Sequence, residues 1–385
     1  MQPRDNRIRR QSPSRRKRRA KQRASMGRLP VRQILTGAGI ACVILLAILL
    51  IPKMFRKEQA SELVPGDIID SAMTAITGDA SDISYLQREA KIQYNAINEP
   101  YRYGDEIVFS ATSGNMSYTR MVVFNTETKE SEIIPAKVKY NNLTGMVMNE
   151  KYIVYLDASA GGGGRICCYH RQDGTFTYIK EYLYAMPKLA LDGDFLAFLQ
   201  QAGESTDRLY VCNLNTGETV TPKVFEGSAG ATGGVHLDGA MLTYATTYYE
   251  GDVLMSRVTT LDLLSGQETV FDWDRLVYMP MRDGNHLAFM SAASGVPDDV
   301  YLSENGGTPQ LLVSGVTNMK MGDGFLAYTK DQAVYVYVFE TGKSFRLNTA
   351  VSKALLSSVE GKSVCWYDVT SYDDVDIVKY AEMEW

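Results

Sequence analysis

Short apolar runs recur along the chain, and each closes on a large aromatic side chain. A representative run is LDGDFLAFLQ at residues 191–200. Successive side chains of a strand point to opposite faces. Leu196 and Phe198 therefore share one face, and Ala197 takes the other. A run this short, apolar on both faces and introduced by a turn, predicts a β-strand buried between two neighbouring sheets.

The same pattern occurs seven times. Its closing aromatic residues are Phe109, Tyr155, Phe198, Tyr244, Phe289, Tyr328 and Trp366. Successive members are 46, 43, 46, 45, 39 and 38 residues apart. Repeats of about 40–45 residues are typical of four-stranded propeller blades.

Each unit also has a second half that ends in a tight turn. Examples are QDGT at 172–175, NTGE at 215–218 and ETGK at 340–343. Glycine adopts the positive φ that hairpin turns require, so these turns join two strands. A shorter apolar run follows most of them, which brings the unit to four strands.

The last unit is incomplete, because after Trp366 only one more strand fits before the chain stops. EAKIQYN at 89–95 precedes the first unit and is left without a partner. If this segment pairs as the outer strand of the last blade, the ring closes without an open edge. We therefore predict an all-β fold, a seven-bladed β-propeller over 89–385, with six blades as the alternative.

The Asp-Gly turn of the representative run raises the question of a catalytic acid pair. The later repeats at 238–244, 283–289 and 322–328 keep the Asp-Gly step. They replace Asp194 by Ala240, Asn285 or Phe325. A catalytic acid pair would not recur in several repeats with its second carboxylate replaced, whereas a turn that introduces a strand would recur. We interpret Asp192 and Gly193 as a structural turn and Phe198 as a core residue.

The amino terminus differs sharply from the rest of the chain. Residues 1–33 contain thirteen Lys and Arg residues against one Asp, and 34–51 contain no charge. At about 1.5 Å rise per residue, such a segment spans most of a roughly 30 Å hydrocarbon core. We predict a transmembrane helix over 34–52, an uncleaved signal-anchor, because the segment is long for a signal peptide and lacks a small-residue cleavage site.

Positive charge fixes the expected orientation. Only Lys53, Arg56 and Lys57 follow the apolar segment closely, so the basic tail 1–33 is expected in the cytoplasm. There it would contact the anionic inner leaflet. Residues 53–88 are expected to form a juxtamembrane stalk, and the propeller to lie outside the cell membrane. The basic run alone would also suit nucleic acid, but no nucleic-acid-binding motif accompanies it, so we do not expect that partner.

The repeats resemble those of TolB-type and WD-repeat-like β-propellers. The resemblance rests on the DG turn before an apolar strand and on the NTGE-like turn after a later strand. It covers about three quarters of the chain and implies an extracytoplasmic interaction module. TolB-type proteins usually have six blades, a cleaved signal and a separate amino-terminal domain, whereas this sequence predicts seven blades and an anchor.

Catalytic motifs are missing from the sequence. The three histidines are scattered, so no zinc site is predicted, and there is no G-x-S-x-G motif. GGGG at 161–164 lacks the Lys-Ser/Thr step of a phosphate-binding loop and is interpreted as a loop between two strands. The cysteines are interpreted as small buried side chains, with one disulfide as the alternative. We therefore predict no catalytic residues, metal or cofactor.

Three loops at the same phase of the repeat are candidate binding segments. They are expected on one face of the propeller, around its central channel, and tyrosines among carboxylates are typical of binding surfaces. The candidate residues are Tyr248, Tyr249, Asp252, Asp298, Asp299, Tyr372 and Asp373. The alternatives are ordinary solvated loops, or a calcium site that includes Asp298, Asp299, Asp373 or Asp374.

The sequence thus predicts a membrane-anchored, extracytoplasmic propeller that binds or scaffolds a protein or glycan of the cell envelope. The alternative is a propeller-type carbohydrate-active or lactonase-like hydrolase. A third hypothesis is an envelope sensor with the basic tail as its cytoplasmic part.

Overall fold

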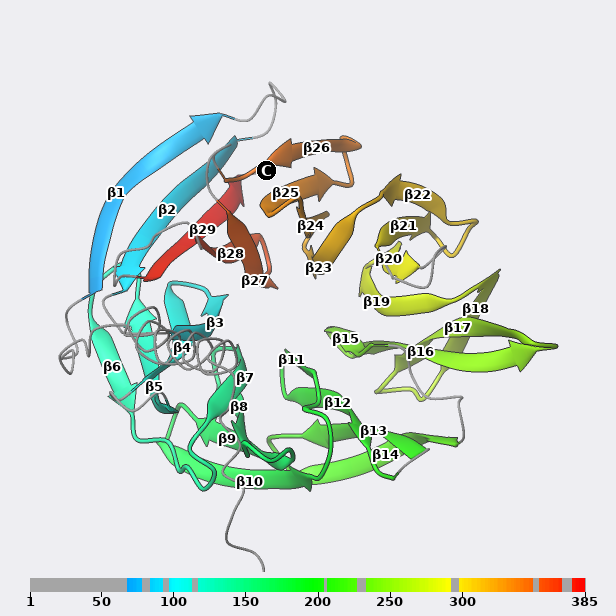
Figure 1. The fold of residues 1–385 in the computed structure, drawn as a ribbon, viewed down its shortest axis with the longest axis horizontal. Helices are drawn as coiled ribbons and strands as arrows, with labels where there is room; N and C mark the ends of the chain where they lie inside the picture. Colours follow the sequence, from blue (N-terminus) through cyan, green and yellow to red (C-terminus); the bar gives the residue numbers. More distant parts are fainter. Residues whose placement is uncertain are drawn as a thin grey trace, which may run out of the picture. The chain divides into compact units, whose positions relative to one another are not determined.

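A computed structural model describes residues 68–77, 84–92, 97–112, 117–203, 206–226, 233–291, 298–348, 353–368 and 376–384. Throughout these ranges the regular elements are β-strands (Figure 1). They include no helix with the length and apolar character needed to cross a membrane. The predicted tail 1–33 and transmembrane helix 34–52 lie outside the described residues.

The strands form seven antiparallel sheets, which we number as blades in chain order. Blade 1 contains β3 (Ile97–Tyr103), β4 (Glu106–Thr112), β5 (Tyr118–Asn125) and β6 (Ser131–Ile134). Blade 2 contains β7 (Leu143–Met148), β8 (Tyr152–Ala158), β9 (Gly164–His170) and β10 (Thr175–Tyr182). Blade 3 contains β11 (Leu189–Asp192), β12 (Phe195–Gln201), β13 (Thr206–Asn213) and β14 (Glu218–Glu226).

The next three blades repeat this order. Blade 4 contains β15 (Val235–Asp238), β16 (Met241–Glu250), β17 (Val253–Asp262) and β18 (Glu268–Arg275). Blade 5 contains β19 (Val277–Asp283), β20 (His286–Ser291), β21 (Asp299–Glu304) and β22 (Gln310–Val313). Blade 6 contains β23 (Val316–Gly322), β24 (Phe325–Lys330), β25 (Ala333–Val338) and β26 (Lys343–Arg346).

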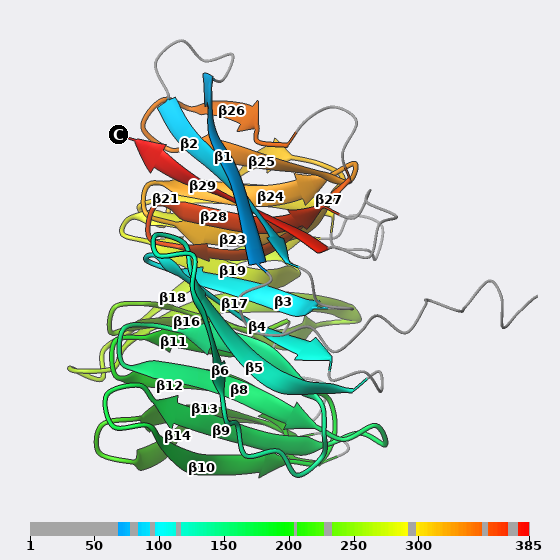
Figure 2. The same cartoon turned by 90° about the vertical axis from the view of Figure 1, so that its left-hand side faces the viewer.

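Blade 7 joins the two ends of the propeller. Its inner strands are β27 (Ala354–Glu360), β28 (Ser363–Asp368) and β29 (Asp376–Glu384). β2 (Ser84–Ile92) pairs with β29, and β1 (Ile68–Thr77) pairs with β2 as a fifth strand (Figure 2). The predicted closure by the segment before the first repeat is confirmed. Within the expected stalk, residues 84–88 are instead part of β2, which pairs with β29, and residues 68–77 form β1, which pairs with β2.

The first strand of each blade lies innermost, and these strands contact one another around a closed ring (Figure 1). The seven-bladed prediction is therefore confirmed, and the six-bladed alternative is wrong. Each innermost strand ends at the turn that contains the Asp-Gly step or its equivalent. All seven of these turns consequently lie on one face of the ring.

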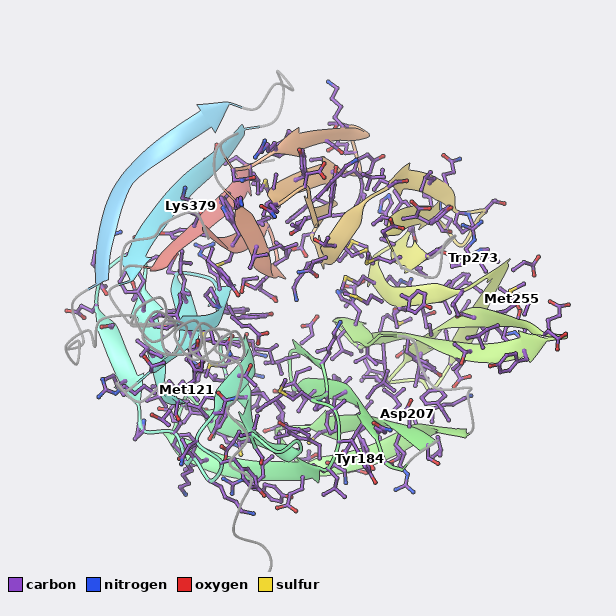
Figure 3. The ribbon with its side chains drawn as sticks, viewed as in Figure 1. Met121, Tyr184, Asp207, Met255, Trp273 and Lys379 are labelled. Carbon is purple, nitrogen blue, oxygen red and sulfur yellow. The ribbon has the colours of Figure 1, made fainter. Side chains whose placement is uncertain are left out.

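The space between blades is filled as the alternation of bulky and small residues predicts. Leu196 and Phe198 pack against blade 2, whereas Ala197 packs against Leu242 and Tyr244 of blade 4. The same arrangement recurs at every interface, and Figure 3 shows side chains such as Met121 between blades. Full burial of such a large apolar side chain contributes about 1.5–3 kcal/mol. The bulky face of each blade thus packs on the small face of the preceding one.

The Asp-Gly turns are linked to one another around the ring. The Asp192 carboxylate accepts a hydrogen bond from the N–H of Gly239 at 2.7 Å. Asp238 accepts from Gly284 at 3.0 Å, and Asp283 accepts from Gly324 at 2.7 Å. Gly193 has a φ of 51°, which glycine adopts without steric cost. Asp192 and Gly193 thus have the structural role expected from the sequence, and Asp192 in addition lines the central cavity.

Four cysteines lie among the described residues, and all four are buried free thiols. Cys167 and Cys168 face opposite sides of β9 and belong to different inter-blade clusters. Their interpretation as small buried side chains is confirmed, and no disulfide links these four. Cys42 lies outside the described residues.

Candidate functional site

A cavity of about 650 Å³ occupies the centre of the ring. Every innermost strand, from β3 of blade 1 to β27 of blade 7, contributes lining residues. Ligand sites in proteins are typically concave and of about 300–1,000 Å³. The central cavity therefore has the size of a small-ligand site.

One end of the cavity is acidic. The innermost strands end there, and their turns place carboxylates side by side around the ring. We call this set the acidic rim, and it consists of Asp192, Asp238, Asp283, Asp323 and Glu360. Burial raises the pKa of Asp192, and the charge of Asp238 raises it further. Burial together with the charge of Asp283 does the same to the pKa of Asp323.

Glu360 is the most strongly perturbed member of the acidic rim. Burial, followed by the charges of Asp192 and Asp323, raises its pKa to about 7, although a hydrogen bond from Tyr101 opposes the shift. The Tyr101 hydroxyl donates that bond to Glu360 Oε2 at 2.8 Å. Burial and the charge of Glu360 raise the pKa of Tyr101 well above its usual value. Glu360 can therefore exchange a proton near neutral pH.

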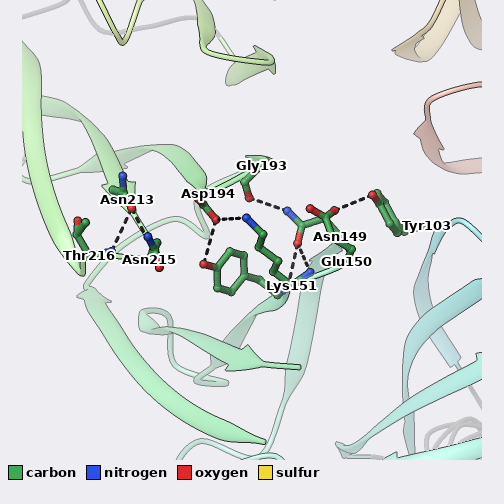
Figure 4. Close-up of polar contacts among 10 residues, drawn as sticks. Tyr103, Asn149, Glu150, Lys151, Gly193, Asp194, Asn213, Asn215 and Thr216 are labelled. Atoms are coloured by element: carbon green, nitrogen blue, oxygen red, sulfur yellow. Dashed lines mark hydrogen bonds and ion pairs between the residues drawn. The ribbon is translucent and has the colours of Figure 1, made fainter. Parts of the chain in front are cut away.

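Further polar contacts brace the turns of blades 1 to 3 (Figure 4). Tyr103 donates to Glu150 at 2.7 Å, and the Asn149 side chain donates to the Gly193 carbonyl at 2.8 Å. Asp194 accepts from the Lys151 ammonium at 3.0 Å and from the Tyr152 hydroxyl at 3.1 Å. Asp194 thus serves the contact between blades 2 and 3, which agrees with its interpretation as no part of an acid pair.

The cavity also contains cationic groups. Lys188 precedes β11 and Lys320 lies on β23, and both line the cavity. Partial desolvation beside the cavity lowers the pKa of Lys188, although its side chain is exposed to solvent. Burial and the charge of Lys188 lower the pKa of Lys320, while the charge of Glu99 opposes this shift. We call Lys188, Lys320 and Glu99 the lysine cluster.

His236 lies on β15, two residues before Asp238 of the acidic rim. Burial lowers its pKa to about 4, so the ring is neutral at physiological pH. Its Nδ1 accepts a hydrogen bond from the N–H of Arg282 at 3.3 Å. In a neutral imidazole the other nitrogen then carries the proton. His236 therefore carries its proton on Nε2, and it is one of the residues that line the cavity.

The residues proposed from sequence lie elsewhere. Tyr248, Tyr249 and Asp252 lie at the tip of the β16–β17 hairpin, and Asp298 and Asp299 lie at the start of β21. None of these five lines the cavity. Met255, which pairs with Tyr248, lies at the periphery of the ring in Figure 3. The expectation that these loops surround the channel is therefore wrong for the hairpin of blade 4. Tyr372 and Asp373 lie outside the described residues.

Tyr248 is already engaged within its own blade. Its hydroxyl donates to Asp272 at 2.9 Å, and the Arg257 guanidinium lies over its ring at 4.1 Å. Arg257 also donates to Asp272 at 2.7 Å. This cluster stiffens the hairpin and leaves Tyr249, which is 57% exposed, as the accessible aromatic residue of the tip.

Sequence reasoning missed the cavity residues Glu99, Lys188, His236, Lys320 and Glu360. A signal for two of them exists in the repeat. His236 and Lys320 both lie two residues before the last residue of their innermost strand, where other innermost strands carry Ala190 and Met281. A charged or polar side chain at that position faces the centre of the ring.

The described residues contain no group of three or more His, Cys, Asp or Glu side chains arranged to hold a metal ion. Among the described residues that line the cavity, the one serine is Ser357, and its hydroxyl donates to the Pro100 carbonyl at 2.6 Å and not to a base. The charged groups available there include the Glu360 carboxyl and the other carboxylates of the acidic rim, two ammonium groups and the Arg282 guanidinium, beside one imidazole. These groups suit recognition of a polar ligand, or acid–base chemistry centred on Glu360.

Fold and cavity together define a seven-bladed β-propeller with a charged central cavity. The sequence matches no family model and no curated protein. Among solved structures, the β-propeller domain of the trilobed protease from Pyrococcus furiosus is similar, with a TM-score of 0.58 and 12% identity. The match covers 74% of this chain and 92% of that one.

Two enzymes show a comparable likeness. Oligogalacturonate lyase from Vibrio parahaemolyticus has a TM-score of 0.54 at 12% identity, over 83% of this chain and 98% of that one. Acylaminoacyl peptidase from Pyrococcus horikoshii has a TM-score of 0.55 at 11% identity, over 73% of this chain and 50% of that one. At such identities the likeness establishes the propeller fold.

Proposed function

We propose that this protein is a membrane-anchored, extracytoplasmic binding module of the cell envelope, and that its ligand occupies the central cavity. The observation that carries the proposal is the cavity itself, to which all seven blades contribute and which contains carboxylate, ammonium and imidazole groups. Such a site recognises polar ligands through a few placed charged groups. The partner expected from sequence, an envelope glycan or a protein segment, suits this chemistry.

The proposed anchor rests on the sequence of residues 1–57. It requires the basic tail to lie in the cytoplasm and the propeller outside. Protease treatment of intact spheroplasts tests this arrangement directly. We expect an epitope at the carboxyl terminus to be digested and one at the amino terminus to be protected. Protection of both epitopes would contradict the extracytoplasmic location.

The binding role is tested with the full chain in nanodiscs. The protein is equilibrated with fractionated envelope glycans and peptides, and retained compounds are identified by mass spectrometry. One variant carries Asp192→Asn with Glu360→Gln at the acidic rim. A second carries Tyr248→Ala, Tyr249→Ala and Asp252→Ala at the hairpin tip.

We expect the acidic-rim variant to lose the retained ligand and the hairpin variant to keep it. The reverse result would move the site to the hairpin. Retention of the same compounds by both variants, or of none by the wild type, would refute binding at either place. Thermal unfolding of each variant shows whether the propeller is intact.

A second candidate function is a carbohydrate-active or lactonase-like hydrolase. It is favoured by Glu360, whose pKa of about 7 is suitable for a general acid or base near neutral pH. Incubation of the wild type with envelope glycans should then release product, and Glu360→Gln should abolish the release. Product release that survives this substitution would exclude Glu360 as the catalytic group.

A further inference from the structure

The lysine cluster brings two cations to one side of the cavity without a matching pair of carboxylates. In the described part of the chain, neither Lys188 nor Lys320 forms an ion pair. The recorded contact of the Lys188 ammonium is with the Met279 sulfur at 3.5 Å, and sulfur is a weak acceptor. Placing two ammonium groups near each other is unfavourable unless an anion accompanies them.

One glycine of blade 4 lies against Lys188, and the glycine before it lies against Met279. Lys188 belongs to blade 3 and reaches Met279 of blade 5, so its side chain passes blade 4. Blade 4 has Gly233 and Gly234 at that point, with φ of 94° and 135°. A Cβ on Gly234 would lie 3.4 Å from Cδ of Lys188, and one on Gly233 would lie 3.0 Å from Cγ of Met279. The GGVH segment thus contacts both the Lys188 side chain and Met279, and His236 follows it in the sequence.

Strained backbone marks the same region. Glu99 and Met279 have φ of 43° and 48°, which cost energy for residues other than glycine. Each lies in a bulge of its innermost strand, between Asn98 and Tyr101 in β3 and between Tyr278 and Met281 in β19. Bulges re-aim side chains and are frequent beside functional sites. Both residues line the cavity.

Glu99 offsets part of the positive charge and is itself held in place. Its Oε2 accepts hydrogen bonds from the N–H of Gly145 at 2.9 Å and from the Thr144 hydroxyl at 3.2 Å. One carboxylate against two ammonium groups leaves one positive charge in the cluster. The neutral His236 adds an Nε2–H donor without adding charge.

We infer that the lysine cluster is an anion site, at which Lys188 and Lys320 bind a carboxylate or phosphate group of the ligand and His236 donates a hydrogen bond to it. This inference rests on the proposed binding function and specifies its ligand class. Charge-assisted hydrogen bonds from ammonium groups to such oxygens are among the strong ones in proteins.

The acidic rim restricts the rest of the ligand. Asp192, Asp238 and Asp283 each use Oδ2 for a glycine N–H, which leaves the other oxygen as an acceptor. A ligand with an anionic group at one end and hydroxyl groups at the other therefore complements the cavity. Acidic sugars have this chemistry.

The experiment measures binding to the full chain in nanodiscs by saturation-transfer NMR. The probes are glucuronate, glucose and inorganic phosphate. We expect glucuronate to bind at least about tenfold more tightly than glucose, and phosphate to displace it, because the carboxylate supplies the charge-assisted contacts. If phosphate displaces glucuronate, the lysines bind anions in general. If glucuronate stays bound in the presence of phosphate, the site is specific for the carboxylate of a sugar.

Lys320→Met and Lys188→Met should each weaken glucuronate binding about tenfold or more, since each removes one such contact. Lys353→Met removes the same charge from an exposed residue and should have no effect. Equal binding of glucuronate and glucose, no binding of either anion at 50 mM, or unchanged binding by both lysine variants would overturn the inference.

A measurement on the wild type avoids dependence on the variants. Reductive methylation followed by peptide mass spectrometry should show Lys188 and Lys320 protected by glucuronate but not by glucose, and Lys353 unaffected. Equal labelling with and without glucuronate would count against the site. If the acidic-rim variant still loses envelope ligands while these anions fail to bind, the anion inference fails and the proposed binding function stands.

Discussion

The Arg102 guanidinium of blade 1 donates to the Glu382 carboxylate of blade 7 at 2.5 Å. Arg102 is 1% exposed, whereas the Glu382 side chain is 41% exposed. The guanidinium also donates to the Ser363 hydroxyl and lies 4.6 Å from the ring centroid of Tyr380. A single buried cation thus ties together the two ends of the propeller.

This asymmetry predicts that removal of the exposed partner is the more damaging change. Glu382→Gln leaves a buried guanidinium without its counter-charge, and we expect a loss of about 3 kcal/mol in the free energy of unfolding. Arg102→Met removes the charge together with its desolvation cost and should lose less. Urea denaturation of the full chain measures both values.

The matched control is the exposed pair of Lys139 and Glu181, each 50% exposed and 3.5 Å apart. Glu181→Gln should change stability by less than about 0.5 kcal/mol, because surface ion pairs contribute little. A larger loss for Arg102→Met than for Glu382→Gln would mean that packing of the arginine outweighs its charge.

The architecture could be predicted from the sequence because it is repeated. Because the pattern occurs seven times, an irregularity in one copy does not obscure it. The alternation of Phe198 with Ala197 indicates a strand that is buried on both faces. Closure by a segment before the first repeat followed from the incomplete last unit. β1 could not be predicted in this way, since a fifth strand has no counterpart in the other blades.

The cavity residues could not be predicted because they depart from the repeat. His236 and Lys320 occupy a repeat position that carries Ala190 or Met281 in other blades, and this departure is visible only after the strands are aligned. Glu99 and Met279 line the cavity from bulges, which shift the alternation by one residue. Lys188 precedes its strand and reaches across to Met279 of blade 5. Such convergence depends on three-dimensional neighbours.

The glycines of the run at 161–164 should differ widely in how much stability is lost when they are replaced by alanine. A Cβ on Gly164 would lie 2.5 Å from both the Asp157 carbonyl oxygen and the Tyr182 hydroxyl. Gly164→Ala should therefore cost about 1–3 kcal/mol, the usual range for overpacking. Gly161 has only the Ser159 hydroxyl near that position, at 3.9 Å. Gly161→Ala should be neutral or slightly stabilising in thermal unfolding, and equal losses at the two positions would contradict the crowding at Gly164.

Two cavity residues should give stability opposite dependences on pH. The pKa of His236 falls from 6.5 to about 4, so between these values the unfolded chain binds more protons and stability decreases as the pH falls. The pKa of Glu360 rises from 4.5 to about 7, so in that window the folded chain binds more protons and stability decreases as the pH rises.

The two effects oppose each other in the wild type, and single variants should separate them. In His236→Gln the contribution of Glu360 remains, so the free energy of unfolding should decrease from about pH 4.5 to 7. In Glu360→Gln the contribution of His236 remains, so the free energy of unfolding should increase from about pH 4 to 6.5. Urea midpoints measured between pH 4 and 8 provide the test. Glu250→Gln, at the exposed hairpin tip, should keep the wild-type profile. If the urea midpoints of the His236 and Glu360 variants changed with pH in the same way, these two groups would not determine the pH dependence of stability.

Closure of the ring depends on β2 more than on β1. β2 pairs with β29 on one side and β1 on the other, and Ala90 is paired with Val378 of β29. Proline removes a backbone donor and is poorly tolerated inside a sheet. Ala90→Pro should therefore cost more than about 2 kcal/mol and lower the yield of folded protein. Ala75→Pro, placed in the edge strand β1, is the matched control and should cost clearly less. Equal effects of the two prolines on the urea midpoint would mean that β2 does not close the propeller.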